Sequence, residues 1–136
     1  MKILIADDDP IYRELMGGLL SGWSFDVVLA SDGAQAMRLL SEDPTVRLAL
    51  LDWMMPEMDG YEVCRRLRAQ SEYDDLFVVM VTGTRDRDQI LQVILAGADD
   101  YLIKPFDPMD LKIRIRNAIR LINLQDELRQ KSQPTA

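Results

Sequence analysis

Residues 48–56 read Leu48-Ala49-Leu50-Leu51-Asp52-Trp53-Met54-Met55-Pro56, an apolar run that ends in a carboxylate. A short apolar run bounded by turn-forming residues predicts a strand that is buried on both faces. Asp52 therefore stands at the carboxyl end of a buried strand, and a helix is expected to begin at Gly60, after the loop. In open α/β sheets, ligands bind at the carboxyl ends of the strands. This position makes Asp52 the first candidate for a functional residue.

The composition excludes several kinds of site. The chain has 136 residues, one cysteine (Cys64) and no histidine, so it lacks an intrachain disulfide, a thiolate cluster and the commonest general base and zinc ligand. No apolar run approaches the ~20 residues of a membrane span. The N-terminus does not read as a signal peptide, so we expect a cytoplasmic protein without membrane contact. A net charge of −7 argues against direct nucleic-acid binding by this domain.

Strand and helix patterns alternate five times along the chain. Apolar strands are predicted at residues 2–6, 25–30, 47–51, 76–81 and 100–103, and helices near residues 10–22, 33–40, 60–68, 86–96 and 109–130. Short connections between them favour a parallel sheet with helices on both faces, a doubly wound α/β fold. The second strand has the weakest apolar run and is placed at an edge, which gives the order 2-1-3-4-5 with right-handed crossovers.

The last predicted helix is longer than the sheet requires. It continues to about residue 130 without glycine or proline. We expect its second half to lie beyond the sheet. In that half, Leu121, Leu124 and Leu128 form a short heptad-like seam. We therefore divide the chain into a domain of residues 1–120 and an extension of residues 121–136, with a disordered tail from residue 132. The extension favours either a homodimer through this helix or a linker to an output domain.

Further polar residues follow the other predicted strands. Asp7 and Asp8 follow the first strand, Thr82 the fourth and Lys104 the fifth, so these groups should meet Asp52 at one edge of the sheet. Three carboxylates repel one another and need a cation. Without histidine or paired cysteines, a hard ion that prefers oxygen ligands is expected, namely Mg²⁺ or else Mn²⁺. A lysine and a hydroxyl nearby fit the oxygens of a phosphoryl group, with a carboxylate as the nucleophile.

These motifs resemble the receiver domain of two-component response regulators. The resemblance covers about residues 1–120 and depends on four stretches in order, which are residues 3–9 (ILIADDD), 51–60 (LDWMMPEMDG), 79–82 (VMVT) and 97–106 (GADDYLIKPF). It implies a flavodoxin-like fold and a phosphoprotein of a phosphorelay. Such a domain accepts a phosphoryl group from a sensor histidine kinase or a phosphotransfer protein in a Mg²⁺-dependent reaction. It is not an enzyme, although it assists its own phosphorylation and dephosphorylation, and it regulates an output domain or effector protein.

The resemblance assigns the central roles position by position. It implies that Asp52 is the phosphoacceptor and that Thr82 and Lys104 contact the phosphoryl group. Asp7, Asp8 and Asp52 correspond to the metal ligands.

Further positions have roles only by the resemblance. The backbone carbonyl of Met54 would complete the metal ligands. Thr82 and Tyr101 match the switch positions, through which the face of the fourth helix, fifth strand and fifth helix would respond. Met54 and Thr84 match positions that tune the lifetime of the phosphoryl group, and the Lys104–Pro105 bond is expected to be cis.

Three other functions fit a similar fold. An aspartyl-phosphate phosphatase would carry a second carboxylate two residues after the nucleophile, where this chain has Met54. A phosphorylation-independent interaction module would not need the acidic pair, the threonine and the lysine, all of which are present. A flavin- or nucleotide-binding protein would have a glycine-rich loop after the first strand, and residues 7–10 contain no glycine.

Overall fold

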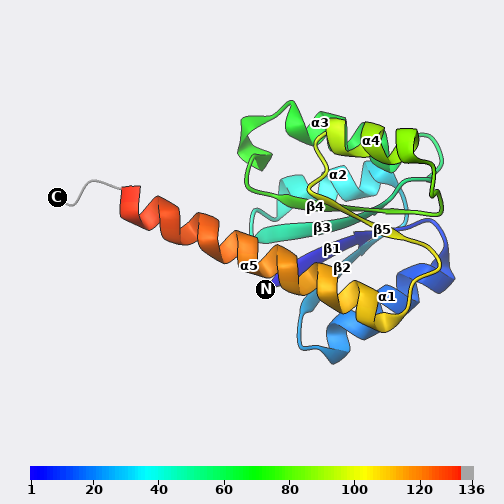
Figure 1. Cartoon of the computed structure of the whole chain (residues 1–136), viewed down its shortest axis with the longest axis horizontal. Coiled ribbons are helices and arrows are strands. Elements are labelled where there is room, and N and C mark those ends of the chain that lie inside the picture. Colours follow the sequence, from blue (N-terminus) through cyan, green and yellow to red (C-terminus); the bar gives the residue numbers. More distant parts are fainter. Residues whose placement is uncertain (133–136) are drawn as a thin grey trace.

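The computed structural model describes residues 1–132, in which five strands alternate with five helices (Figure 1). The strands are β1 (Lys2–Ala6), β2 (Asp26–Ala30), β3 (Val46–Asp52), β4 (Phe77–Thr82) and β5 (Asp100–Ile103). The helices are α1 (Pro10–Gly22), α2 (Gly33–Glu42), α3 (Gly60–Arg68), α4 (Arg87–Leu95) and α5 (Pro108–Ser132), and a 3₁₀ turn spans Ser71–Tyr73. Every predicted element is present, and the ends differ from the prediction by about two residues at most.

The sheet is parallel and has the order β2-β1-β3-β4-β5, which confirms the predicted doubly wound fold with β2 at an edge. The chain passes from β1 outward to β2 and then returns to pair β3 with the other side of β1. A crevice opens at the carboxyl ends of the strands where the direction of winding reverses. In this sheet that point lies between β1 and β3, the strands that precede the acidic pair and Asp52.

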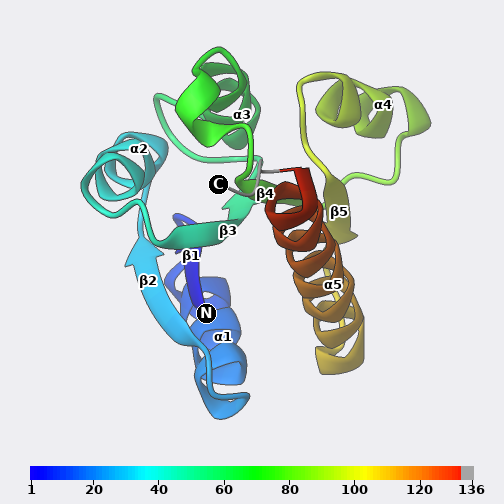
Figure 2. The same ribbon diagram turned by 90° about the vertical axis from the view of Figure 1, so that its left-hand side faces the viewer.

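Helices α1 and α5 cover one face of the sheet, and α2, α3 and α4 cover the other (Figure 2). Successive strand residues alternate between the two cores, as the two-residue period of a strand requires. In β1, for example, Ile3 and Ile5 face α1 and α5, whereas Leu4 faces the opposite layer. All six residues of β4 are buried, as expected for a central strand covered on both faces.

Aspartates cap the amino ends of all five helices and account for part of the acidic composition. Asp9 accepts a hydrogen bond from the Ile11 amide at 2.9 Å, with Pro10 in the first turn. Asp32, Asp59 and Asp86 cap α2, α3 and α4 in the same way. At the start of α5, Asp107 accepts from the amide of Asp110 at 3.0 Å. These carboxylates satisfy helix amides that would otherwise lack partners, so they are structural rather than part of the acidic cluster.

Helix α5 remains attached to the domain for longer than the sequence predicts. Ile122 is 1% exposed and belongs to the core between α5 and the sheet, although we placed it in an extension beyond the sheet. Further along, Asp126 pairs with Arg47 at the start of β3 at 3.0 Å, and Arg129 pairs with Asp75. These contacts continue the buried side of the helix beyond residue 120, and the division of the chain at that residue stays a prediction.

The far part of α5 nevertheless projects past the amino ends of the strands (Figure 1). Leu121, Leu124 and Leu128 are 48%, 45% and 67% exposed. At about 100° per residue, this seam lies roughly 120° around the helix from the buried side. The predicted disordered tail from residue 132 begins inside α5, and residues 133–136 lie outside the described part of the chain. Within residues 1–132, no helix is both long enough and apolar enough to span a bilayer.

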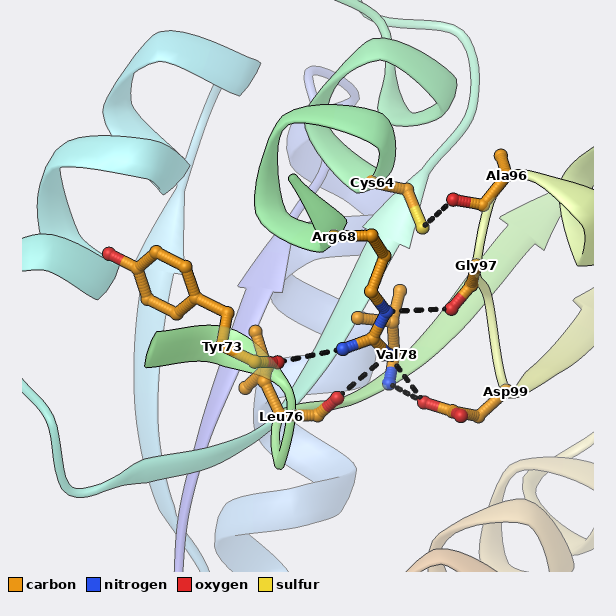
Figure 3. A network of polar contacts seen from close by, with 8 residues as sticks. All are labelled: Cys64, Arg68, Tyr73, Leu76, Val78, Ala96, Gly97 and Asp99. Carbon is orange, nitrogen blue, oxygen red and sulfur yellow. Dashed lines mark hydrogen bonds and ion pairs between the residues drawn. The ribbon is translucent and has the colours of Figure 1, made fainter. Parts of the chain in front are cut away.

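Arg68 ties together three segments at the amino-end side of the sheet (Figure 3). Its guanidinium donates hydrogen bonds of 2.8–2.9 Å to the side chain of Asp99 and to the backbone carbonyls of Tyr73, Leu76 and Gly97. The same Asp99 oxygen accepts from the backbone amide of Val78 in β4 at 2.8 Å. One side chain of α3 thereby holds the loop before β4 and the loop before β5.

Gly97, at the end of α4, is required by this arrangement. Its φ of 111° is a conformation that side chains disfavour, and a Cβ at this position would lie 2.4 Å from Cγ of Arg68. Gly97 thus ends α4 in the conformation that glycine favours and makes room for the arginine.

Candidate functional site

Asp52 is the last residue of β3 and is only 6% exposed. It lies opposite Val81 of β4, and the next residue, Trp53, donates its amide hydrogen to the carbonyl of Val81 at 2.9 Å. Helix α3 begins next to the backbone carbonyl of Asp52. A Cβ on Gly60 would lie 2.4 Å from the carbonyl oxygen of Asp52, so only glycine allows the helix to begin so close to the strand end.

Asp7 and Asp8 meet Asp52 across the crevice. Asp7 is fully buried and Asp8 is exposed, and one carboxylate oxygen from each of the three residues lies within 4.8 Å of the others. Asp7 is held firmly, because one of its oxygens accepts from the amide of Asp9 at 2.9 Å and its carbonyl accepts from the guanidinium of Arg13 at 2.8 Å. The site is therefore a preformed cluster with one member open to solvent.

Lys104 and Thr82 complete the group of residues that the sequence placed at this edge. The Lys104 ammonium donates to Asp7 at 2.9 Å and lies 3.4 Å from an oxygen of Asp52. Its backbone amide donates to the carbonyl of Thr82 at 2.7 Å, and Thr82 is 3% exposed at the end of β4. The peptide bond between Lys104 and Pro105 is cis, as the resemblance implies.

The carboxyl of Asp52 is hard to ionise in this environment. Burial and the neighbouring charge of Asp7 raise its pKa to about 7, against the opposing effect of Lys104. Burial alone would lower the pKa of Lys104, but its contacts with Asp7 and Asp52 outweigh that effect and the pKa rises. One ammonium thus contacts two of the three carboxyl groups, and the cluster retains excess negative charge.

Because ionised Asp52 is unfavourable in the folded protein, Asp52→Asn should stabilise the metal-free protein at alkaline pH. The folded pKa of about 7 lies above the ordinary 3.8, so the stability of the wild-type protein falls as pH rises through that window. The neutral amide avoids this loss. We expect the melting temperature of the variant to exceed that of the wild type by on the order of 5 °C at about pH 8, and the two to be similar near pH 4. Thermal unfolding in a chelator measures this, and a gap that is equal at both pH values would contradict it.

The remaining candidates lie around this cluster rather than in it. Met54 is 75% exposed in the loop after β3. The Thr84 hydroxyl donates to Gln89 and accepts from the amide of Asp86, so it is engaged with the start of α4. Tyr101 is half-buried, and the guanidinium of Arg114 lies 5.8 Å from its ring centroid. The roles assigned to these three residues stay predictions.

Sequence reasoning missed the aromatic support of the lysine. The Lys104 ammonium lies 4.1 Å from the ring centroid of Tyr12, and that ring is 5.9 Å from the ring of Phe106. Tyr12 is in the first turn of α1, beside the acidic pair, which was a usable signal. Its pairing with a lysine 92 positions away could not be read from any local pattern.

The donor set suits a divalent cation that prefers oxygen ligands. Three carboxylates from two strand ends converge, two of them are buried, and one lysine does not balance their charge. Few protein ligands and one exposed member are typical of Mg²⁺ sites, where the ion keeps some of its water. Asp7, Asp8 and Asp52 are the residues that would hold it.

Comparison with known proteins agrees with this geometry. Residues 3–116 match the family described as the response regulator receiver domain. The chain is 33% identical over 120 residues to a chemotaxis protein CheY homolog of Campylobacter jejuni, covering 88% of this chain and 92% of that protein. It is 40% identical over 119 residues to the DNA-binding response regulator MtrA of Mycolicibacterium smegmatis, covering 88% of this chain and 50% of MtrA. The chain thus spans about half the length of MtrA and of several other curated relatives.

Solved structures show the same architecture. The Francisella response regulator 1452 receiver domain superposes with a TM-score of 0.81 at 28% identity, over 88% of this chain and 96% of that one. A two-component response regulator/GGDEF domain protein superposes with a TM-score of 0.86 at 28% identity, over 90% of this chain and 50% of that one. With the family match, the strand order and the acidic cluster in agreement, the chain belongs to the receiver domains of two-component response regulators.

Proposed function

We propose that Asp52 accepts a phosphoryl group from a phosphohistidine on a sensor kinase or phosphotransfer protein, and that the modified domain regulates an output domain or effector. The observation that carries this proposal is the cluster itself: a buried carboxylate at a strand end, two further carboxylates within 4.8 Å and a lysine 3.4 Å away. The absence of histidine from the chain fits a donor on another protein.

In the proposed step, an oxygen of ionised Asp52 attacks the phosphorus of the donor. The P–N bond breaks, its electron pair returns to the imidazole, and an acyl phosphate forms on Asp52. Lys104 neutralises charge on the transferring oxygens, and a bound Mg²⁺ would supply the further positive charge that such a transfer needs. Asp7, Asp8 and Asp52, with the backbone carbonyl of Met54, would hold the metal in this proposal.

The response follows from the new negative charge beside Thr82. We infer that the Thr82 hydroxyl, which accepts from the amide of Thr84 at 3.1 Å, turns toward the phosphoryl oxygens as a donor. Tyr101 then changes its position, and the face of α4, β5 and α5 adopts a different population of states. Arg114 belongs to this face, since it pairs with Asp100 at 3.5 Å and lies near the Tyr101 ring.

Incubation with acetyl phosphate tests the proposal without a kinase. We expect intact-protein mass spectrometry to detect one phosphoryl adduct in the presence of Mg²⁺ and a strong loss of that adduct with a chelator. The proposal is contradicted if folded protein gains no adduct from acetyl phosphate or from any phosphohistidine donor, or if the adduct forms equally without a divalent metal.

Met54→Asn should shorten the lifetime of the phosphoryl group. Hydrolysis requires water to approach the phosphorus, and the thioether of Met54 cannot orient that water by donating a hydrogen bond, whereas an amide can. One such bond corresponds to about tenfold in rate. The decay of the adduct after removal of acetyl phosphate measures the effect, and Met54→Leu is the matched control. Equal decay rates for the asparagine and leucine variants would refute it.

The extension of α5 carries the proposals on assembly. We keep residues 1–120 as the receiver domain and propose that residues 121–136 lead to an output domain or pair with a second copy through Leu121, Leu124 and Leu128. Exposure of this seam supports the proposal, because the ion pairs of Asp126 and Arg129 bind another side of the helix to the domain.

A further inference from the structure

Helices α1 and α5 lie on the same face of the sheet (Figure 1). An apolar groove lies between the end of α1 and the first half of α5. It has a volume of about 460 Å³ and is lined by Trp23, Phe25, Lys112, Ile115, Arg116 and Ile119. Trp23 follows α1 and Phe25 precedes β2, so the groove lies toward the amino ends of the strands, at the opposite edge of the sheet from Asp52. It is therefore separate from the acidic cluster.

The two aromatic residues are fixed by the way α1 ends. The amide of Ser24 donates to the carbonyl of Ser21 at 3.0 Å, and the amide of Phe25 donates to that of Leu20 at 3.0 Å. This is the Schellman pattern, in which the residue after the cap adopts a left-handed conformation. Here that residue is Ser24, with φ of 71°, where glycine is usual. The turn holds Trp23 and Phe25 half-buried at the groove.

Cations line one edge of the groove without acidic partners. The Lys112 ammonium lies 5.7 Å from the Trp23 ring centroid, Arg116 follows one turn later, and Arg120 continues the same stripe. All three are exposed, and none forms an ion pair with another residue in the described part of the chain. This is unusual in a protein with a net charge of −7, where acids outnumber bases 23 to 16. The groove is thus a local positive surface on an acidic protein.

The groove is also distinct from the face of α4, β5 and α5. Arg114, which belongs to that face, is two residues from both Lys112 and Arg116 and so points roughly 200° away around the helix. The two surfaces lie on opposite flanks of α5. A partner in the groove would not compete directly for the face that we expect to respond to phosphorylation.

We propose that this groove binds an amphipathic helix of a partner protein that carries acidic residues beside its apolar anchors. Apolar side chains of the helix would contact Trp23, Phe25 and Ile119, and its carboxylates would face Lys112, Arg116 and Arg120. A groove of about 460 Å³ favours a helix over a flat membrane surface, because side chains of a helix can enter it. The charge of the stripe selects an acidic partner over a basic one.

Synthetic peptides test this proposal on the whole chain. One peptide is an amphipathic helix with leucine and phenylalanine at positions i, i+3, i+4 and i+7 and glutamate on the flanking positions. A second has lysine in place of each glutamate, and a third has the acidic composition in scrambled order. We expect the acidic helix to shift the NMR signal of the Trp23 indole, and to bind about tenfold more tightly than the other two.

Charge-reversal variants distinguish binding in the groove from nonspecific attraction between the acidic peptide and any basic surface. Lys112→Glu/Arg116→Glu should weaken binding of the acidic helix about tenfold, whereas the matched Arg85→Glu/Arg87→Glu, with the same charge change at exposed sites near α4, should leave it nearly unchanged. Both pairs are exposed, so neither should affect folding.

Four results would overturn the proposal. The first is that the Trp23 signal does not move at millimolar acidic peptide, and the second is that the lysine peptide binds equally well. The third is that Trp23 responds to anionic vesicles but not to peptide. The fourth is that the protein self-associates and the Lys112→Glu/Arg116→Glu variant abolishes this. The third would assign the groove to a membrane surface and the fourth to a second copy of this chain.

Discussion

Asp52→Ala should abolish the Mg²⁺-dependent phosphoryl adduct. The variant removes the only carboxylate of the cluster that is both at the end of β3 and 3.4 Å from Lys104, so no remaining acid occupies the same position relative to the ammonium. Loss of a covalent nucleophile removes the reaction rather than slowing it by the hundredfold or so expected from loss of one electrostatic contact. Intact mass after incubation with acetyl phosphate measures this directly.

Lys104→Ala provides the matched comparison. It keeps the nucleophile and removes one stabilising charge, so we expect the adduct to form more slowly, by about a hundredfold, rather than not at all. Circular dichroism establishes that both variants are folded. An adduct on Asp52→Ala at the wild-type level would mean that another residue is the acceptor and would exclude the assignment.

Arg68→Met should produce a large loss of stability although Arg68 lies outside the apolar core. The arginine satisfies three backbone carbonyls and the Asp99 carboxylate, and its side chain is only 20% exposed. Methionine preserves much of the apolar stem but leaves these acceptors without their donor (Figure 3). We expect the free energy of unfolding to fall by about 3 kcal/mol in urea denaturation.

Arg66→Met is the control on the same helix. Within the described residues 1–132, the Arg66 side chain pairs with Glu62 alone, at 3.1 Å, and it is 54% exposed. The expected loss is below about 0.5 kcal/mol. The account of the network is wrong if the two variants unfold at the same urea concentration. Because Arg68 fixes the loop before β5, Arg68→Met should also broaden the NMR signals of Gly97 and Asp99 more than those of β1.

The fold and the main site could be predicted because the signals are periodic or local. Buried strands read as apolar runs, and each is followed by polar residues whose positions at one sheet edge follow from parallel pairing. Asp7, Asp52 and Lys104 were placed together by this reasoning, although 97 positions separate the two residues that form the 2.9 Å ion pair. The topology alone was enough to bring them to one crevice.

The sequence did not reveal contacts that depend on side-chain reach between elements. Arg68 reads as one of several arginines on α3, and nothing local distinguishes it from Arg65 or Arg66. The ion pair between Asp126 and Arg47 could not be predicted for the same reason, since 79 positions separate the two residues. The support of Lys104 by Tyr12 belongs to this class as well.

Borohydride reduction followed by peptide mapping is the most direct test of the central claim. The reagent reduces an acyl phosphate to an alcohol and so marks the carboxyl that carried the phosphoryl group. After treatment with acetyl phosphate and Mg²⁺, we predict that the mark lies at position 52 and at no other aspartate. A mark on Asp7, Asp8 or a residue outside the cluster, or a phosphorylated protein with no reducible acyl phosphate, would contradict the claim that Asp52 is the phosphoacceptor.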